Sequence, residues 1–233
     1  MLYIVPTPLG NLQDITLRAL EVLKSADGVL CEDTRRTQGL LAHFGISKPT
    51  YRYNENDERS VERCLSYLQA GKTFALVSDC GTPCISDPGW KLVKRAAEVG
   101  VKVSSLPGPS AVACALAGAG ITGGAFTFLG FLPRKAGKAA KLLSGAAALK
   151  RPVVLYESPY RVAKMLVLIA QTLGSNVPVV VARELSKVYE EWVRGSAGEV
   201  AEKFGAQKKV LGEFVIIIDC FDSKEENETD EDF

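Results

Sequence analysis

The chain has 233 residues, of which 47% are hydrophobic and 24% charged, and its formal net charge is +1. These values are ordinary for a folded globular protein, and no apolar run reaches the ~18 residues that a membrane-spanning helix needs. The first residues lack the basic segment and cleavage site of a signal peptide, so we expect a cytoplasmic protein with no membrane partner.

Short apolar runs alternate with helical patterns in the first half of the chain. Four runs rich in valine, leucine and isoleucine predict strands at residues 2–6, 28–32, 73–78 and 101–106. Apolar side chains that recur every three to four residues predict helices at residues 16–26, 58–70 and 90–99. Strand and helix alternation predicts an α/β domain over residues 1–117, with mainly parallel strands.

A glycine-rich stretch at residues 118–124 indicates a linker, after which the alternation resumes. Strands are predicted at residues 125–130, 152–156, 177–182 and 213–220, and helices at 138–149 and 159–173. The fold class is therefore α/β, with two α/β domains whose sheets are mainly parallel, the second over residues 118–221. We expect a ligand site in the cleft between them, since such clefts often bind ligands.

The charge is unevenly distributed. Residues 222–233 hold seven acidic residues and one lysine, a net of −6, which leaves +7 for the rest of the chain. A segment this polar and acidic cannot bury enough surface to fold, so we expect a disordered acidic tail. A net charge of +7 on residues 1–221 is compatible with a polyanionic partner, and equally with scattered lysines that only interact with solvent.

Polar residues gather in the loops that directly follow predicted strands, where open α/β sheets bind their ligands. The loop at residues 6–16 contains two prolines and Gly10 but no G-x-G-x-x-G motif, so a stiff connector is an equally good interpretation. The loop at residues 31–37 contains Glu32, Asp33 and two arginines. A capped helix start and a phosphate-binding cluster both remain open there.

The loop at residues 78–89 is the most informative. It contains two glycines, two prolines, two serines, a threonine and two aspartates directly after an apolar strand. Gly81 permits a ligand to approach the backbone, and Asp79, Thr82 and Ser86 offer oxygens to ribose hydroxyls and an amino group. The loop at residues 106–111 repeats this pattern, with Ser110 before a helix. Loops at 156–161 and 182–187 also follow strands, although helix caps and surface ion pairs explain them as well.

The chain contains six cysteines and one histidine. They show no C-x2-C pair and no Cys/His zinc pattern. We therefore expect no bound metal.

These motifs, taken in order along nearly the whole chain, resemble the family of small-subunit ribosomal RNA ribose 2′-O-methyltransferases I. That family belongs to the tetrapyrrole methylase-like, class III methyltransferases that use S-adenosyl-L-methionine. The matching segments are Pro8–Thr16, Glu32–Arg35, Ser78–Gly89, Leu106–Ala111, Gly130–Arg134, Tyr156–Ser158, Ala182–Leu185, Glu190–Glu191 and Arg194–Gly195. The third of these is the most specific.

The resemblance implies two α/β domains with the methyl donor in the cleft between them, and a homodimer. It implies that the substrate is a cytidine ribose in the decoding region of 16S ribosomal RNA, free or in the small ribosomal subunit. The residues expected to bind the donor are Leu9, Ser78, Asp79, Gly81, Thr82, Pro83, Ser110, Ala111, Tyr156, Glu157, Ser158, Ala182 and Gly212.

A ribose hydroxyl is a weak nucleophile at neutral pH, so a base or hydrogen-bond acceptor is expected beside it. Three carboxylates are candidates, without a ranking among them: Glu32, Asp33 and Glu184. Three basic residues are candidates for contacts to RNA phosphates: Arg35, Arg183 and Lys187.

Several positions depart from the family pattern. Cys80 stands where alanine is usual, Tyr160 where histidine is usual and Leu211 where lysine is usual, and residues 52–56 lack the expected histidines. The chain also ends soon after the last predicted strand, without the longer C-terminal extension of many members. These departures lie in segments that are expected to contact the substrate.

Two alternatives therefore stay open. One is a methyltransferase of the same fold that acts on a tetrapyrrole or on a protein side chain, although the first loop lacks the glycine-rich opening of tetrapyrrole methylases. The other is a donor-binding protein without transfer activity.

Overall fold

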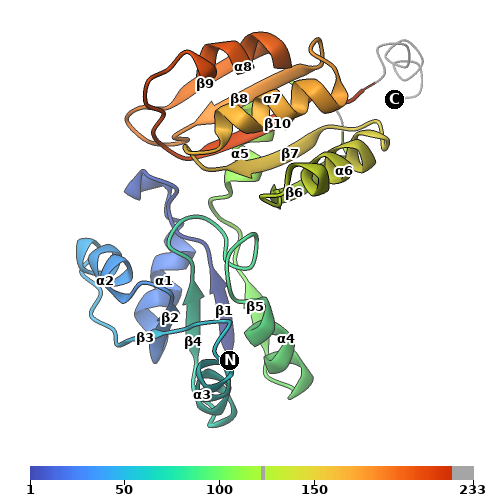
Figure 1. Ribbon diagram of the computed structural model, residues 1–233. Helices are drawn as coiled ribbons and strands as arrows, with labels where there is room; N and C mark the ends of the chain where they lie inside the picture. The colour runs from blue at the N-terminus through green and yellow to red at the C-terminus, as the bar shows by residue number, and fades with distance from the viewer. Residues whose placement is uncertain (122–123, 222–233) are drawn as a thin grey trace, which may run out of the picture. The chain divides into compact units, whose positions relative to one another are not determined.

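The chain folds into two compact units, Met1–Ser110 and Ala111–Phe233. The computed structural model describes residues 1–121 and 124–221 (Figure 1). Each unit contains one five-stranded sheet with helices packed on it, which confirms the predicted class of two α/β domains. The acidic segment predicted to be disordered, residues 222–233, lies outside the described residues.

The first unit is built on a parallel sheet whose strand order is β3-β2-β4-β1-β5 (Figure 1). The strands are β1 (Leu2–Val5), β2 (Gly28–Cys31), β3 (Thr50–Arg52), β4 (Phe74–Val77) and β5 (Val103–Ser105). Every residue of β2 and of β4 is buried, as expected for central strands of a parallel sheet that is covered on both faces. Since all five strands are parallel, the loops after them leave from one edge of the sheet.

The helices of this unit are α1 (Leu17–Ser25), α2 (Thr34–His43), α3 (Glu58–Gln69) and α4 (Trp90–Glu98), with a short 3-10 turn η1 (Leu12–Asp14) before α1. Three of the four α-helices described in this unit begin at a residue whose side chain caps them, and α4 begins after Gly89 without such a cap. Thr16, Asp33 and Asp57 each accept a hydrogen bond from a backbone N–H of the first turn. Two separate apolar clusters contain α1 with α2 and α3 with α4, so both faces of the sheet are buried.

The second sheet is mixed, which corrects the prediction of mainly parallel strands. Its order is β6-β7-β10-β8-β9, and β6 with β7 is its one parallel pair among the described residues. The strands are β6 (Thr127–Phe131), β7 (Val153–Glu157), β8 (Pro178–Arg183), β9 (Glu191–Ser196) and β10 (Phe214–Ile218). Strand β9, which the sequence analysis missed, lies at the edge of the sheet. Only one of its residues is buried, so its sequence lacks a strong apolar pattern.

Helix α5 (Ala111–Ala119) belongs to the second unit. Its buried residues Val112, Ala115 and Ala119 pack with Val180 and Val215 of the second sheet. The boundary proposed from the glycine-rich stretch, between residues 117 and 118, falls inside this helix, and the compact units divide before it instead.

Three further helices cover the opposite face of the second sheet. They are α6 (Ala136–Ala147), α7 (Val162–Leu173) and α8 (Ala197–Gly205). Their apolar residues form one cluster with the inward side chains of β7, β8 and β10. None of the helices within residues 1–121 and 124–221 has both the length and the apolar character that crossing a membrane requires.

Candidate active site

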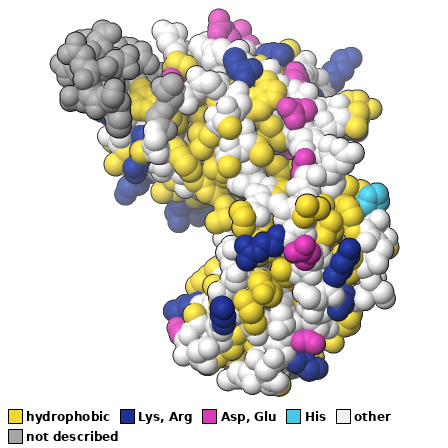
Figure 2. Space-filling view, turned by 180° about the vertical axis from the view of Figure 1, so that it is seen from behind, with side chains coloured by type: hydrophobic (Ala, Val, Ile, Leu, Met, Phe, Trp, Pro, Cys, Tyr) yellow, Lys and Arg dark blue, Asp and Glu magenta, His cyan; other side chains and the backbone are white. Residues whose placement is uncertain are grey.

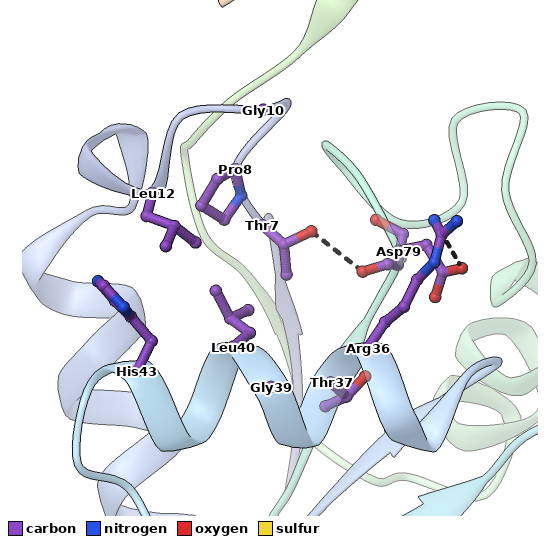
Figure 3. Close-up of a pocket in the computed structure, with 11 residues that line it drawn as sticks. Thr7, Pro8, Gly10, Leu12, Arg36, Thr37, Gly39, Leu40, His43 and Asp79 are labelled. Carbon is purple, nitrogen blue, oxygen red and sulfur yellow. Dashed lines mark hydrogen bonds and ion pairs between the residues drawn. The ribbon is translucent and has the colours of Figure 1, made fainter. Parts of the chain in front are cut away.

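Three loops meet at the carboxyl edge of the first sheet. Strands β1 and β4 are neighbours, and the loops after them are joined by a two-way backbone bridge. Thr7 N donates to Gly81 O at 2.9 Å, and Gly81 N donates to Thr7 O at 3.0 Å. The buried Thr7 hydroxyl also donates to Ser78 O at 3.0 Å (Figure 3). The sequence prediction missed Thr7, although a threonine between two prolines directly after a strand marks its position.

The hydroxyl groups of this edge hold the loops together. Ser78 Oγ donates to Gly81 O at 2.9 Å, and Thr82 Oγ1 donates to Pro109 O, in the loop after β5, at 2.8 Å. Cys80 Sγ lies 3.2 Å from Leu9 O, so the departure from alanine adds a weak link between two loops. The hydroxyl protons of Ser78 and Thr82 are thus committed to the protein, and their first role is to shape the edge.

Gly81 keeps the backbone of this edge open. Its φ is +81°, in the region that favours glycine, and an added Cβ would lie 3.2 Å from Leu9 Cδ2. A side chain at this position would fill the space beside the Thr7 bridge. The predicted reason for Gly81, close approach of a ligand to the backbone, agrees with this geometry.

Carboxylates surround the open edge. Asp79, in the loop after β4, lies 3.4 Å from Arg36 Nη1 on α2, a pair that is largely open to solvent on the arginine side. Glu55 Oε2 accepts a hydrogen bond from Gly89 N at 2.7 Å, which ties residues 52–56 to the loop at 78–89. Partial burial and the nearby carboxylates of Asp79 and Glu55 raise the pKa of Glu32. Three acidic groups therefore share one negative region.

Asp33 has a different environment from its neighbour Glu32. Its Oδ1 accepts hydrogen bonds from the backbone N–H groups of Arg35 at 2.8 Å and of Arg36 at 3.3 Å. These bonds lower the pKa of Asp33. Asp33 therefore caps α2, which is one of the two interpretations that the sequence left open.

A cavity of about 410 Å³ opens beside Asp79, between the loop after β1 and helix α2 (Figure 3). Arg36, Gly39, Leu40 and His43 line it from one face of α2, opposite Leu12 of η1. Figure 2 shows the histidine side chain, in cyan, at the surface. The sequence prediction missed this face, although the spacing of three, four and seven residues from position 36 is the signal of one helical stripe.

In the second unit, several residues predicted to bind the methyl donor lie at the same end of neighbouring strands. Val215, near the start of β10, is paired with Tyr156 of β7 on one side and with Ala182 of β8 on the other. Ser158 directly follows β7, and its N–H donates to Glu157 Oε1 at 2.8 Å. The Tyr156 ring packs against Phe128 and Phe131, with centroids 4.9 and 5.6 Å apart. That these residues bind a donor stays a prediction.

Glu184 and Lys187 form a network with the segment before β10. Lys187 Nζ donates to Glu184 Oε1 and to Glu213 Oε2, each at 2.9 Å, and Glu213 N also donates to Glu184 Oε1 at 2.9 Å. Burial alone would raise the pKa of Glu184, but these hydrogen bonds and nearby positive charges hold it below its usual value. Gly212 lies against this carboxylate, since an added Cβ would be 2.6 Å from Glu184 Cγ. A carboxylate held ionised in this way is a poor proton acceptor.

The three residues predicted to contact RNA phosphates differ in whether their charges already have a partner in the protein. Arg183 Nε donates to Leu211 O at 2.7 Å, and its Nη1 donates to Glu191 at 3.2 Å, so its charge is already partnered. Lys187 is partnered as described above. The Arg35 side chain is exposed at the start of α2. Within residues 1–121 and 124–221, no three His, Cys, Asp or Glu side chains lie close enough to hold a metal ion.

Comparisons with known proteins agree with one another. The family model of tetrapyrrole (corrin/porphyrin) methylases matches residues 1–201. The ribosomal RNA small subunit methyltransferase I of Mesorhizobium japonicum is 40% identical over 99% of this chain and 79% of its own length. The Thermotoga maritima protein of the same name is 42% identical over 93% of this chain and 97% of its own length.

A solved structure gives the same fold. The uroporphyrin-III C-methyltransferase of Thermus thermophilus, in complex with S-adenyl homocysteine, is similar with a TM-score of 0.67 and 19% identity. The match covers 94% of this chain and 97% of that one. At this identity the likeness establishes the fold alone.

Proposed function

This chain belongs to the ribosomal RNA small subunit methyltransferase I family of the tetrapyrrole methylases, and from this premise we propose that it methylates ribosomal RNA. The reaction is transfer of a methyl group from S-adenosyl-L-methionine to the 2′-hydroxyl of a cytidine ribose in 16S ribosomal RNA. The observation that carries the proposal is the identity of about 40% over nearly the whole chain. Relatives that act on tetrapyrroles share the fold at about 20% identity.

The first unit fits a cationic methyl donor. Asp79, Glu32 and Glu55 make its open edge negative, which favours a sulfonium and an α-amino group. Gly81 leaves its backbone accessible, and Leu9 supplies a buried apolar wall beside it. We assign Asp79 to the positive end of the donor, and Leu9 and Gly81 to its apolar part. The donor contacts expected from Ser110, Ala111 and the second unit stay predictions.

When bound, the donor supplies an activated methyl group whose leaving sulfur becomes neutral as the methyl departs. The chain must hold the ribose oxygen in line with that methyl, which is an effect of orientation. We propose Glu32 as the group that accepts the hydroxyl proton, because it shares the negative region with Asp79 and has a raised pKa. Asp33 and Glu184 are weaker candidates, since both carboxylates are engaged in hydrogen bonds and have lowered pKa values.

We assign the cavity beside Asp79 to the substrate nucleoside. Its walls are mostly apolar, with Leu12 and Leu40 suited to the face of a base and Arg36 and His43 suited to its polar edge or a phosphate. Asp79 belongs to both the cavity and the proposed donor site, so a nucleoside held here lies next to the donor.

Filling this cavity is expected to weaken RNA binding. A Cβ at Gly39 meets no atom within 4 Å, so Gly39→Leu extends into the cavity without displacing the protein. We expect the KM for RNA to rise by about tenfold, the loss of one good apolar contact, while the Kd for the donor stays unchanged. Steady-state kinetics and calorimetry measure the two values. Gly145→Leu in α6 is the matched control, because Gly145 is also a helical glycine with free space around it, and it should leave both values unchanged. An unchanged KM in Gly39→Leu would remove the cavity from the substrate site.

Incubation of the protein with radiolabelled donor and purified small ribosomal subunits tests the function. Label in 16S ribosomal RNA, at a ribose 2′-oxygen, is the expected result. Label in a tetrapyrrole or in a protein side chain instead would establish one of the sister activities. Tight donor binding without transfer to any of these substrates would identify a binding protein.

We further propose that the protein works as a homodimer in the cytoplasm, where ribosomal subunits are assembled. The family resemblance supports the dimer. Sedimentation equilibrium at micromolar concentration tests it, and a mass of one chain under those conditions contradicts it.

A further inference from the structure

A second cavity, of about 590 Å³, lies within the second unit. It is lined by the loop between β6 and α6, by the start of α6, and by α7 with the residues just before it. Its lining includes Pro133, Arg134, Ser158, Tyr160, Lys164 and Leu168. None of the roles assigned above uses this cavity, apart from Ser158, which is a predicted donor contact.

Two cations that line the cavity have no ion-pair partner among residues 1–121 and 124–221. Arg161 Nη2 donates to Leu132 O at 3.0 Å and lies 3.2 Å from the buried Glu157 carboxylate, so Arg161 serves to fix the floor of the cavity. Arg134 and Lys164 are exposed, and neither makes an ion pair with any residue in the part of the chain that the structure describes. Their charges are available to an anion.

The surroundings of the cavity are basic. From residue 111 to residue 156 the sequence contains six lysines and arginines and no aspartate or glutamate. Lys138 and Lys141 of α6 are exposed beside the cavity loop. Figure 2 shows dark blue side chains at the lower left of the second unit, with no magenta side chain among them. Such a surface attracts a polyanion rather than a single small anion.

Tyr160 provides an aromatic surface at the same place. Its side chain is among the most exposed large apolar groups of the chain, at 87%. It lines the same cavity as Arg134 and Lys164. A solvent-exposed ring next to unpaired cations is the combination by which proteins bind single-stranded nucleic acid, because the ring stacks on a base while the cations contact the backbone.

We propose that this cavity binds a single-stranded segment of the RNA substrate, with Arg134 and Lys164 on phosphates and Tyr160 stacked on a base. The inference rests on the proposed function for the identity of the RNA. Ser158, a predicted donor contact, also lines this cavity, whereas the reacting nucleoside is assigned to the other cavity, beside Asp79. The cavity thus supplies binding energy from a part of the substrate that does not react.

Binding of an unstructured, fluorescein-labelled RNA oligonucleotide, followed by anisotropy across a salt series, tests the inference. Arg134→Ala/Lys164→Ala is expected to raise the Kd at least tenfold and to reduce the slope of log Kd against log salt by about 0.7 for each lost phosphate contact. Tyr160→Ala is expected to raise the Kd by about 5- to 150-fold with the slope unchanged, and Tyr160→Phe to restore binding, because stacking needs only the ring. Lys72→Glu, an exposed lysine at the amino end of the first sheet, is the charge control and should bind as the unmodified protein does.

A Kd and a salt slope unchanged in both Arg134→Ala/Lys164→Ala and Tyr160→Ala would overturn the inference, as would no binding of the oligonucleotide to the unmodified protein. Thermal unfolding of each variant identifies any that has lost its fold. If Tyr160→Ala has lost it, the Kd and salt slope of Arg134→Ala/Lys164→Ala decide the outcome. The outcome is separate from that of the proposed function. If these variants bind the oligonucleotide with an unchanged Kd and the protein methylates ribosomal RNA, this inference alone is wrong. If the protein binds RNA through the cavity but methylates none, the proposed function alone is wrong.

Discussion

Replacing Asp79 with alanine is expected to raise the Kd for the methyl donor by about 100-fold and to abolish methyl transfer at ordinary donor concentrations. The change removes a carboxylate from the positive end of the donor and leaves Arg36, 3.4 Å away in the unmodified protein, without its partner. Hydrogen bonds to charged groups contribute about 1.5–3 kcal/mol, and an unpaired like charge beside the sulfonium adds repulsion. Isothermal titration calorimetry with the donor measures the effect.

Arg36 provides an internal check on this assignment. Arg36→Ala/Asp79→Ala removes the repulsion together with the carboxylate, so its Kd should lie between those of the unmodified protein and of Asp79→Ala. Glu98→Gln, which removes an exposed carboxylate that pairs with Lys94 on α4, should bind the donor normally. Normal donor affinity in Asp79→Ala would remove Asp79 from the donor site and with it the assignment of this edge.

Replacing Glu32 with glutamine is expected to lower kcat by about 10²- to 10⁴-fold, the usual contribution of a general base, with the Kd for the donor nearly unchanged. The pH dependence follows from the direction of its pKa. Partial burial and the carboxylates of Asp79 and Glu55 raise the pKa of Glu32, and only its ionised form accepts a proton. Activity is therefore full above this raised pKa and is lost as the pH falls through it. In Glu32→Gln this acidic limb of the kcat profile should disappear.

The neighbouring carboxylate offers the matched control for Glu32. Asp33→Asn keeps a capping side chain on α2, and asparagine caps helices about as well as aspartate. We expect its kcat and its stability to stay close to those of the unmodified protein. If kcat falls in Asp33→Asn or Glu184→Gln while Glu32→Gln is unaffected, the residue whose replacement lowers kcat is the proton acceptor. Unchanged turnover on replacing each of the three with alanine would falsify a carboxylate base altogether.

Much of the candidate site was visible in the sequence, because its residues follow apolar strands directly. The runs that became β1, β2, β4 and β5 are apolar and short, and the glycines, prolines and hydroxyl residues after them mark loops of fixed shape. Parallel pairing then places these loops at one edge without further information. The predictions of Asp79 and Gly81 followed from this rule, whereas Leu9 was expected from the family resemblance.

The chemical role of each side chain was less visible. Ser78 and Thr82 were expected to face a ligand. Instead, the Ser78 hydroxyl donates within its own loop, to Gly81 O, and the Thr82 hydroxyl donates to Pro109 O in the loop after β5. Asp33 and Glu32 are adjacent in the chain, but one caps a helix and the other lies in a negative region formed with Asp79 and Glu55. The surroundings of Glu32 and of Thr82 depend on neighbours that are tens of residues away in the sequence.

The sequence by itself determined the family, the α/β class, the parallel first sheet and the polar loops, since local patterns of apolar and turn residues encode them. The tertiary structure alone decided that β10 lies antiparallel between β7 and β8, that α5 belongs to the second unit, and that one face of α2 lines a cavity. The physical reason is that strand partners and cavity walls are chosen by packing between distant segments, whose energies no local pattern records.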